Sequence, residues 1–251
     1  MAPTPDAAYF DGWYADMVVS PQKDEIAQRH LGLPPHLLST SLLPWSGLGE
    51  VVAALRLSPG DLLLDLACGR GGYGLEIVGR TGCRLVGVDF SAEAVRQARE
   101  LAVRQDARAE FRVGDLAATG LPPGSVDAVL CVDAVQFADE PDSAHREVRR
   151  VLLPGGRVVL SCWEPAARDG DGAPERLRDV HLEARLQRAG FEDVEVQVRP
   201  DWRRLERAMW EEAVALDPAG DPALQSFHDE GVRSLAQFDD VRRVVATATA
   251  P

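Results

Sequence analysis

Short apolar runs alternate with helical stripes of hydrophobic residues along most of this chain of 251 residues. Residues 62–66 are apolar except for Asp65, and residues 85–89 and 128–132 repeat such a run. Runs of this length, bounded by glycine and polar residues, are typical of strands buried in a parallel sheet. The alternation of strands and helices therefore predicts an α/β fold. Further strands are predicted at residues 111–113, 157–163, 194–198 and 243–250.

The segments that flank this core carry helical patterns of their own. Tyr9, Trp13 and Tyr14 belong to an aromatic stripe with the spacing of one helix face, which indicates a cap that packs on the domain or closes over its site. The segment before the last predicted strand is longer than a hairpin needs and contains another helical stripe. We expect a helical cap or lid over residues 1–57 and a main domain over residues 58–251, with a helical insertion over residues 200–239.

A glycine turn follows the first predicted strand. Gly69, Gly71 and Gly74 precede a helical pattern, and Asp89 ends the next strand. Glycine lets a ligand approach the free backbone N–H groups of a helix N-terminus, so this turn predicts a nucleotide-like ligand. The spacing also matches the dinucleotide fingerprint, in which an acid about 20 residues downstream binds the ribose. From these residues alone, an NAD-dependent oxidoreductase stays an open alternative.

Asp65 favours a different cofactor, because a dinucleotide-binding strand usually carries an apolar residue at this position. The stretch DLACGRG at residues 65–71 resembles the first motif of class I S-adenosylmethionine (SAM) dependent methyltransferases. Ala67 stands where that family usually has its first glycine. The resemblance covers residues 62–198 and indicates the small-molecule type, similar to ubiquinone and menaquinone methyltransferases. It implies that SAM is bound by Asp65, Ala67, Gly69, Gly71, Asp89, Phe90, Gly114, Asp115, Leu116 and Val132.

The same resemblance implies a fold and an acceptor site. The fold is a Rossmann-like, doubly wound sheet of seven strands, mostly parallel, with an antiparallel last strand. Asp133 and Gln136, at the exit of the fourth strand, are expected beside the transferred methyl group, as base or acceptor-orienting groups, and His36 is a cap residue suited to proton transfer. The acceptor pocket is expected to be lined by Tyr9, Trp13, Tyr14, Phe137, Trp163 and Trp202.

Composition limits the range of partners. The formal net charge is −13 and no dense basic face is evident, which argues against nucleic acid or an anionic membrane surface. No signal peptide or membrane span is evident, and the four cysteines are widely spaced, so we expect a cytoplasmic protein with reduced thiols and no metal site. The helical insertion is expected to form part of the acceptor pocket wall, with a packing or homodimer surface as the alternative role.

These patterns favour a methyltransferase that transfers the SAM methyl group to an oxygen, nitrogen or carbon atom of a small molecule, such as a secondary metabolite. Two alternatives stay open. One is the NAD-dependent oxidoreductase. The other is a protein that keeps the fold and acts as a cyclase or binding scaffold without transferring a methyl group, because a fold does not fix a function.

Overall fold

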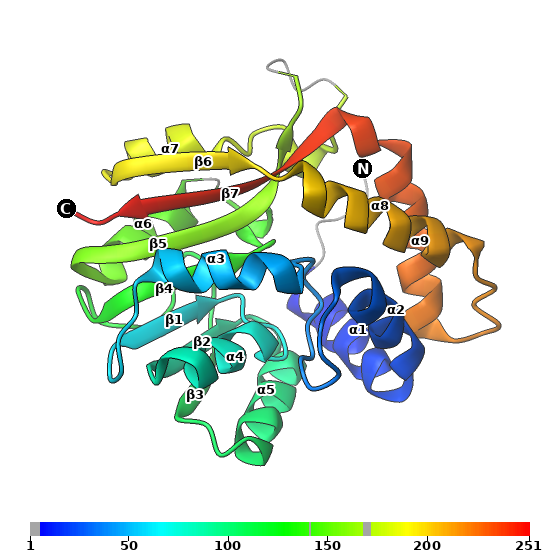
Figure 1. Ribbon diagram of the computed structural model, residues 1–251, viewed down its shortest axis with the longest axis horizontal. Coiled ribbons are helices and arrows are strands. Elements are labelled where there is room, and N and C mark those ends of the chain that lie inside the picture. Colours follow the sequence, from blue (N-terminus) through cyan, green and yellow to red (C-terminus); the bar gives the residue numbers. More distant parts are fainter. Residues whose placement is uncertain (1–5, 141, 168–171) are drawn as a thin grey trace.

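One mixed sheet forms the centre of the computed structural model, which describes residues 6–140, 142–167 and 172–251. Its seven strands run in the order β3-β2-β1-β4-β5-β7-β6 (Figure 1). The last strand, β7, pairs antiparallel with both β5 and β6, and the other neighbouring strands are parallel. This confirms the predicted sheet with an antiparallel last strand. The strands are β1 (Leu62–Leu66), β2 (Arg84–Asp89), β3 (Ala109–Val113), β4 (Val126–Val132), β5 (Leu152–Pro165), β6 (Glu192–Val198) and β7 (Val241–Thr249).

Helices cover both faces of the sheet. The α-helices of the described ranges are α1 (Ala7–Val19), α2 (Pro21–Leu31), α3 (Trp45–Leu55), α4 (Gly72–Thr81), α5 (Ala92–Arg104), α6 (Ser143–Val151), α7 (Leu182–Arg188), α8 (Pro200–Ala215) and α9 (Pro222–Ala236). Successive β1 side chains point to opposite faces. Leu63 belongs to a core cluster with residues of α3, α4, α5 and α8, whereas Leu64 and Leu66 belong to a second cluster with α6 and α7. This is the doubly wound arrangement that the sequence predicted.

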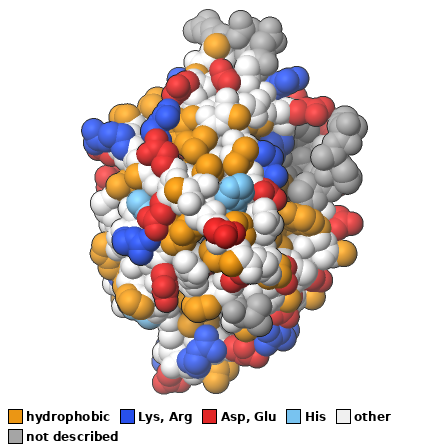
Figure 2. Space-filling view, turned by 90° about the vertical axis from the view of Figure 1, so that its right-hand side faces the viewer, with side chains coloured by type: hydrophobic (Ala, Val, Ile, Leu, Met, Phe, Trp, Pro, Cys, Tyr) orange, Lys and Arg blue, Asp and Glu red, His pale blue; other side chains and the backbone are white. Residues whose placement is uncertain are grey.

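The N-terminal cap and the C-terminal insertion pack together as one helical layer. Figure 1 shows α1 and α2 beside α8 and α9 at one end of the sheet. The Trp13 indole N–H donates to Ser226 Oγ of α9 at 2.9 Å, and His30 Nε2 of α2 lies 2.6 Å from Glu212 Oε2 of α8. On the face that Figure 2 presents, hydrophobic side chains lie among acidic and basic ones. Two segments far apart in sequence thus build one layer.

The described part of the chain contains no helix with the length and apolar character needed to cross a membrane. Within the same residue ranges, no group of three or more His, Cys, Asp or Glu side chains is arranged to hold a metal ion.

Candidate functional site

The glycine turn between β1 and α4 adopts backbone conformations that favour glycine. The φ angles of Ala67, Gly69 and Gly71 are 57°, 51° and 79°, all in the left-handed region. Gly74 is required for a different reason, because a Cβ at this position would lie 2.6 Å from Asp65 Oδ2. The turn therefore brings its backbone close to the Asp65 carboxylate, and Ala67 adopts a conformation that costs an alanine energy.

Two buried carboxylates lie at this turn, and we call this region the cofactor edge (residues 65–71 and 89–91). Asp65 is 3% exposed and Asp89 is 4% exposed. Asp89 accepts hydrogen bonds from the Gly69 N–H at 2.8 Å and the Ser91 N–H at 2.9 Å, and the Gly74 N–H donates to Asp65. Neither carboxylate forms an ion pair with a described basic side chain. Asp65 and Asp89 are therefore two buried carboxyl groups without an ion-pair partner in the described part of the chain.

Burial shifts the titration of both carboxyl groups. It raises the pKa of Asp65 to about 7, and the nearby Asp89 charge acts in the same direction. It also raises the pKa of Asp89 to about 6, although the hydrogen bonds from Ser91 and Gly69 partly oppose it. Because burial disfavours the charged form of both groups, a bound cation at this site would lower both pKa values.

The third acid of the predicted set lies at the same end of the sheet. Asp115 follows β3, and the Gly114 N–H donates to the Asp89 carbonyl at 2.9 Å. The Asp115 side chain is exposed and accepts a hydrogen bond from the Ala117 N–H at 2.7 Å. Because β3, β2 and β1 are parallel neighbours, the structure brings Asp65, Asp89 and Asp115 to one edge, with only the first two buried.

An ion pair ties the cap to the middle of the glycine turn. Arg70 is buried, and its Nη1 and Nη2 atoms donate to the two carboxylate oxygens of Asp24 in α2 at 2.8 and 2.6 Å. Two parallel bonds of this kind are strong and fix the relative orientation of both groups. The position of α2 is therefore coupled to the conformation of the cofactor edge.

Helix α1 also contacts the cofactor edge. The Tyr14 hydroxyl lies 2.8 Å from where a Cβ on Gly69 would be, and it is 3.3 Å from Thr40 Oγ1. Burial and then the Asp89 charge raise the pKa of Tyr14, which keeps its hydroxyl protonated. Asp11 Oδ1 accepts a hydrogen bond from Ser91 Oγ at 2.6 Å. The cap thus lies directly over the predicted cofactor-binding loops.

An aromatic cluster connects α1 with the exits of β2 and β4. The Phe10 ring lies 5.2 Å from the Phe90 ring and 5.8 Å from each of the Phe137 and Trp13 rings. Tyr9 contacts Phe10 but is 51% exposed. Phe10, which the sequence analysis did not include among the site residues, is thus the centre of a cluster that includes five of the predicted site residues, namely Tyr9, Trp13, Tyr14, Phe90 and Phe137.

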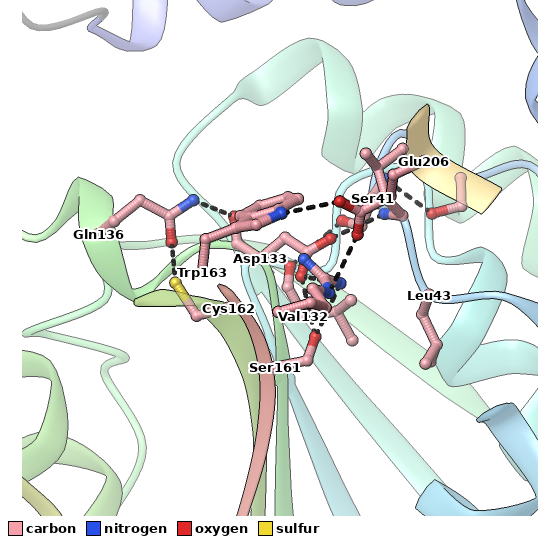
Figure 3. A network of polar contacts seen from close by, with 12 residues as sticks. Ser41, Leu43, Val132, Asp133, Gln136, Ser161, Cys162, Trp163 and Glu206 are labelled. Atoms are coloured by element: carbon pink, nitrogen blue, oxygen red, sulfur yellow. Dashed lines mark hydrogen bonds and ion pairs between the residues drawn. The ribbon is translucent and has the colours of Figure 1, made fainter. Parts of the chain in front are cut away.

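A largely buried polar network follows β4, and we call it, after its predicted role, the acceptor wall (Asp133, Ser161, Trp163, Arg203, Glu206 and Arg243). Figure 3 shows Asp133, Ser161, Trp163 and Glu206 of this network. Asp133 has a left-handed φ of 62°. Its Oδ2 accepts from the Leu42 N–H at 2.7 Å, and its Oδ1 accepts from Ser161 Oγ at 2.9 Å and lies 2.5 Å from Arg243 Nη2. Both carboxylate oxygens of Asp133 are therefore engaged by donors of the chain.

The acceptor wall extends from Asp133 into α8. Arg243 Nε lies 3.3 Å from Glu206 Oε1, and Glu206 Oε2 accepts from the Trp163 indole N–H at 2.9 Å and from Arg203 Nη1 at 2.7 Å. The Arg243 guanidinium carbon is 4.1 Å from the Trp163 ring centre and 5.8 Å from that of Trp202. Burial raises the pKa of Glu206, while both arginines oppose that shift.

The structure brings some predicted site residues together and leaves others apart. Gln136 lies near Asp133, since its Nε2 donates to the Asp133 carbonyl at 2.7 Å and its Oε1 accepts from Cys162 Sγ at 3.0 Å. His36 is not part of this group, because its side chain is 59% exposed and lies 3.1 Å from Glu76 of α4. Ser41, which precedes the first strand, donates to the Val132 carbonyl at 3.2 Å.

Sequence reasoning missed several residues that hold the site together. Glu206 lies on the buried face of α8, and Arg243 shares a strand face with Val245, so each is a charge in an apolar pattern. Such a mismatch is a usable signal, because a buried charge needs a partner. Asp24 and Arg70 gave no such signal, because neither stands in a clear apolar pattern. A separation of 46 residues also hides their pairing.

Comparisons with known proteins show that the chain is similar to methyltransferases. Residues 64–160 match the family model described as a methyltransferase domain. Phosphoethanolamine N-methyltransferase 1 of Arabidopsis thaliana is 29% identical over 161 residues, covering 61% of this chain and 33% of that protein. The 27-O-demethylrifamycin SV methyltransferase of Amycolatopsis mediterranei is 30% identical over 179 residues, covering 62% of this chain and 64% of that protein. The chain thus spans about a third of the length of the first relative.

A solved structure resembles nearly the whole chain. The cyclase SpnF matches with a TM-score of 0.75 and 20% identity, covering 99% of this chain and 97% of that chain. At this level of identity the likeness establishes the fold, and the coverage includes the cap and the insertion.

Proposed function

We propose that this chain, of which residues 64–160 match a methyltransferase domain, is a class I SAM-dependent methyltransferase that transfers the methyl group of SAM to an oxygen, nitrogen or carbon atom of a small molecule. The observation that carries this proposal is the pair of buried carboxylates, Asp65 and Asp89, which no described basic side chain neutralises.

The residues of the cofactor edge fit a cation that also carries a ribose. A sulfonium and an ammonium group would supply the missing positive charge, and Asp89 can accept both ribose hydroxyls as charge-assisted hydrogen bonds. The left-handed turn at Gly69 and Gly71 exposes backbone N–H groups to such a ligand. When bound, SAM supplies the methyl group and its own leaving group. A dinucleotide would instead place its negatively charged pyrophosphate at the glycine turn, beside the two buried carboxylates, so the charge balance supports SAM over NAD.

The remaining chemistry is alignment and the exclusion of water. Phe90, Gly114, Asp115, Leu116 and Val132 are proposed to line the rest of the cofactor site. Asp133 is proposed to orient the acceptor, and Gln136 to support it. The aromatic side chains of the cap and of the exits of β2 and β4 are proposed to hold the acceptor and exclude water, namely Tyr9, Phe10, Trp13, Tyr14, Phe137, Trp163 and Trp202.

Two further features support this assignment. The relatives named above act on phosphoethanolamine and on a rifamycin, which supports a small-molecule acceptor. The four cysteines Cys68, Cys83, Cys131 and Cys162 are free thiols, which supports a reducing compartment such as the cytoplasm.

Side-by-side titrations test the cofactor. SAM and NADH are added separately to the purified protein and followed by calorimetry and by the melting temperature, which rises when a ligand binds the folded state. We expect saturable binding of SAM and none of NADH. Binding of NADH without SAM would instead support the oxidoreductase.

A second assay tests the reaction. The protein is incubated with SAM carrying a deuterated methyl group and a panel of phenols, hydroquinones, amines and β-dicarbonyl compounds. We expect S-adenosylhomocysteine together with a product heavier by one labelled methyl group. A converted acceptor that gains no label, without S-adenosylhomocysteine, would contradict methyl transfer and favour a cyclase.

A further inference from the structure

Four charged side chains of alternating sign form a chain from the site into the helical insertion. Asp133 at the β4 exit pairs with Arg243 of β7 at 2.5 Å, and Arg243 pairs with Glu206 of α8 at 3.3 Å. Glu206 in turn pairs with Arg203 at 2.7 Å. Two acids and two arginines sum to zero charge, so the acceptor wall neutralises itself.

This arrangement lowers the free energy that folding gains, because its charges are removed from water. Arg243 and Glu206 are both 0% exposed, and burying such charges usually stabilises a protein no more than an apolar core would. Arg243 Nη1, Arg243 Nε and Glu206 Oε1 are buried without a hydrogen-bond partner in the described ranges, so the contact between Nε and Oε1 is an ion pair and not a hydrogen bond. Asp133 also keeps a left-handed φ of 62°, which is unfavourable for a residue other than glycine. Strain and buried charge therefore coincide at the end of β4.

The hydrogen bonds of Asp133 limit what it can do. A carboxylate offers about four acceptor positions on its two oxygens. Leu42, Ser161 and Arg243 supply donors to three of them. About one position is left for a hydrogen from another molecule. With a guanidinium and two further donors in place, Asp133 is suited to orient a donor group and poorly suited to remove its proton.

We propose that Arg243 is a positioning residue that fixes the Asp133 carboxylate, with Glu206 fixing Arg243 in turn. We also propose that the acceptor is an uncharged molecule whose hydroxyl or amine hydrogen Asp133 accepts. The second statement follows from the charge balance, because a charged acceptor would find no spare countercharge in the acceptor wall. Both statements rest on the proposed methyl transfer.

Variants of Arg243 and Glu206 test the positioning role with an acceptor that the wild-type protein methylates. In Glu206→Gln and Arg243→Lys we expect kcat to fall about 10- to 100-fold, because small displacements at a reacting centre have effects of this size. The Kd for SAM should stay within about twofold, since the cofactor edge is unchanged. Arg204→Gln is the matched control, because Arg204 lies on the same helix and its side chain is 78% exposed.

The conservative change separates positioning from folding. Lysine keeps the charge but cannot bridge two carboxylates as the planar guanidinium does. We therefore expect Arg243→Lys to melt closer to the wild type than Arg243→Met while keeping a low kcat. Full activity in Arg243→Lys, or a parallel loss of SAM affinity and kcat in Glu206→Gln, would overturn the positioning role. Absence of methyl transfer by the wild type would instead contradict the proposed function.

Paired acceptors test the charge of the substrate. The wild type is assayed with phenols that differ only by a ring carboxylate, and we expect the uncharged member to have the higher kcat/KM. Glu206→Gln removes one negative charge and should shift this ratio towards the carboxylate-bearing phenol. Preference of the wild type for the anionic phenol would contradict the proposal.

Discussion

The cofactor edge and the acceptor wall each bury two carboxylates, but they treat the charge in opposite ways. Asp65 and Asp89 accept hydrogen bonds from backbone N–H groups and have no cationic partner among the described side chains. Asp133 and Glu206 are each paired with arginine. The cofactor edge therefore needs a cation from its ligand, whereas the acceptor wall does not.

This difference assigns different roles to the two regions. Unpaired buried carboxylates destabilise the protein until a cationic ligand neutralises them. The cofactor edge therefore lowers the stability of the free protein and increases its affinity for a cationic ligand. A self-neutralised network gains nothing from a charged ligand, so the acceptor wall acts through shape and hydrogen bonding.

The largest expected effect is the pH dependence of stability without cofactor. The folded protein keeps the Asp65 proton up to about pH 7, whereas the unfolded chain releases it near pH 4. Between these values the unfolded state binds fewer protons, so the free energy of unfolding falls as the pH rises. At about 1.4 kcal/mol per pH unit, Asp65 alone accounts for up to ~4 kcal/mol. Urea unfolding at several pH values measures this slope.

Asp65→Asn is the matched control for this effect. The amide cannot ionise, so the variant should lose less stability than the wild type over the same pH range. Saturating SAM should also reduce the slope in the wild type. Equal slopes in the wild type and the variant would mean that Asp65 is not the source of the pH dependence.

A smaller effect is expected for cofactor affinity in Asp89→Asn. Loss of the charge should weaken the proposed hydrogen bonds to ribose hydroxyls, which are worth about 1.5–3 kcal/mol each, so the Kd for SAM should rise about 10- to 100-fold. Asp115→Asn should have a weaker effect, because Asp115 is exposed. Calorimetry with SAM measures both, and Glu206→Gln in the acceptor wall should bind SAM as the wild type does. Unchanged affinity in Asp89→Asn would contradict the assigned cofactor site.

The cap contacts the cofactor edge through the ion pair between Asp24 and Arg70, and Asp24→Asn tests this contact. The change removes the charge that faces the buried Arg70 guanidinium, which should loosen α2. We expect S-adenosylhomocysteine to dissociate about tenfold faster, since breaking a buried charge pair acts mainly on dissociation. Stopped-flow tryptophan fluorescence measures the rate, with exposed Glu25→Gln on the same helix as the control. Equal dissociation rates in both variants would mean that the cap is not coupled to the cofactor.

The two regions also differ in how far the sequence alone could predict them. Glycines, strand exits and Asp89 lie within a short stretch of chain, so local patterns sufficed for the sheet and the glycine turn. The acceptor wall joins Asp133, Glu206 and Arg243, which come from the end of β4, from α8 and from β7, and Leu42 of the loop before α3 donates to Asp133. Contacts between such distant segments depend on tertiary packing, and no periodicity encodes them. The roles of the individual site residues therefore stay predictions.

The smallest expected effect concerns Ala67, the one departure from the glycine motif. Its φ of 57° costs an alanine roughly 1–2 kcal/mol, whereas glycine loses about 0.5–1 kcal/mol more backbone entropy on folding. Ala67→Gly should therefore raise the melting temperature by about 1–3 °C. Ala219→Gly is the matched control, because Ala219 has a left-handed φ of 50° in a turn after α8. Both variants should melt higher, and only Ala67→Gly should change the Kd for SAM, because only Ala67 lies in the cofactor edge. A lower melting temperature for Ala67→Gly would mean that the alanine methyl group makes packing contacts worth more than the strain.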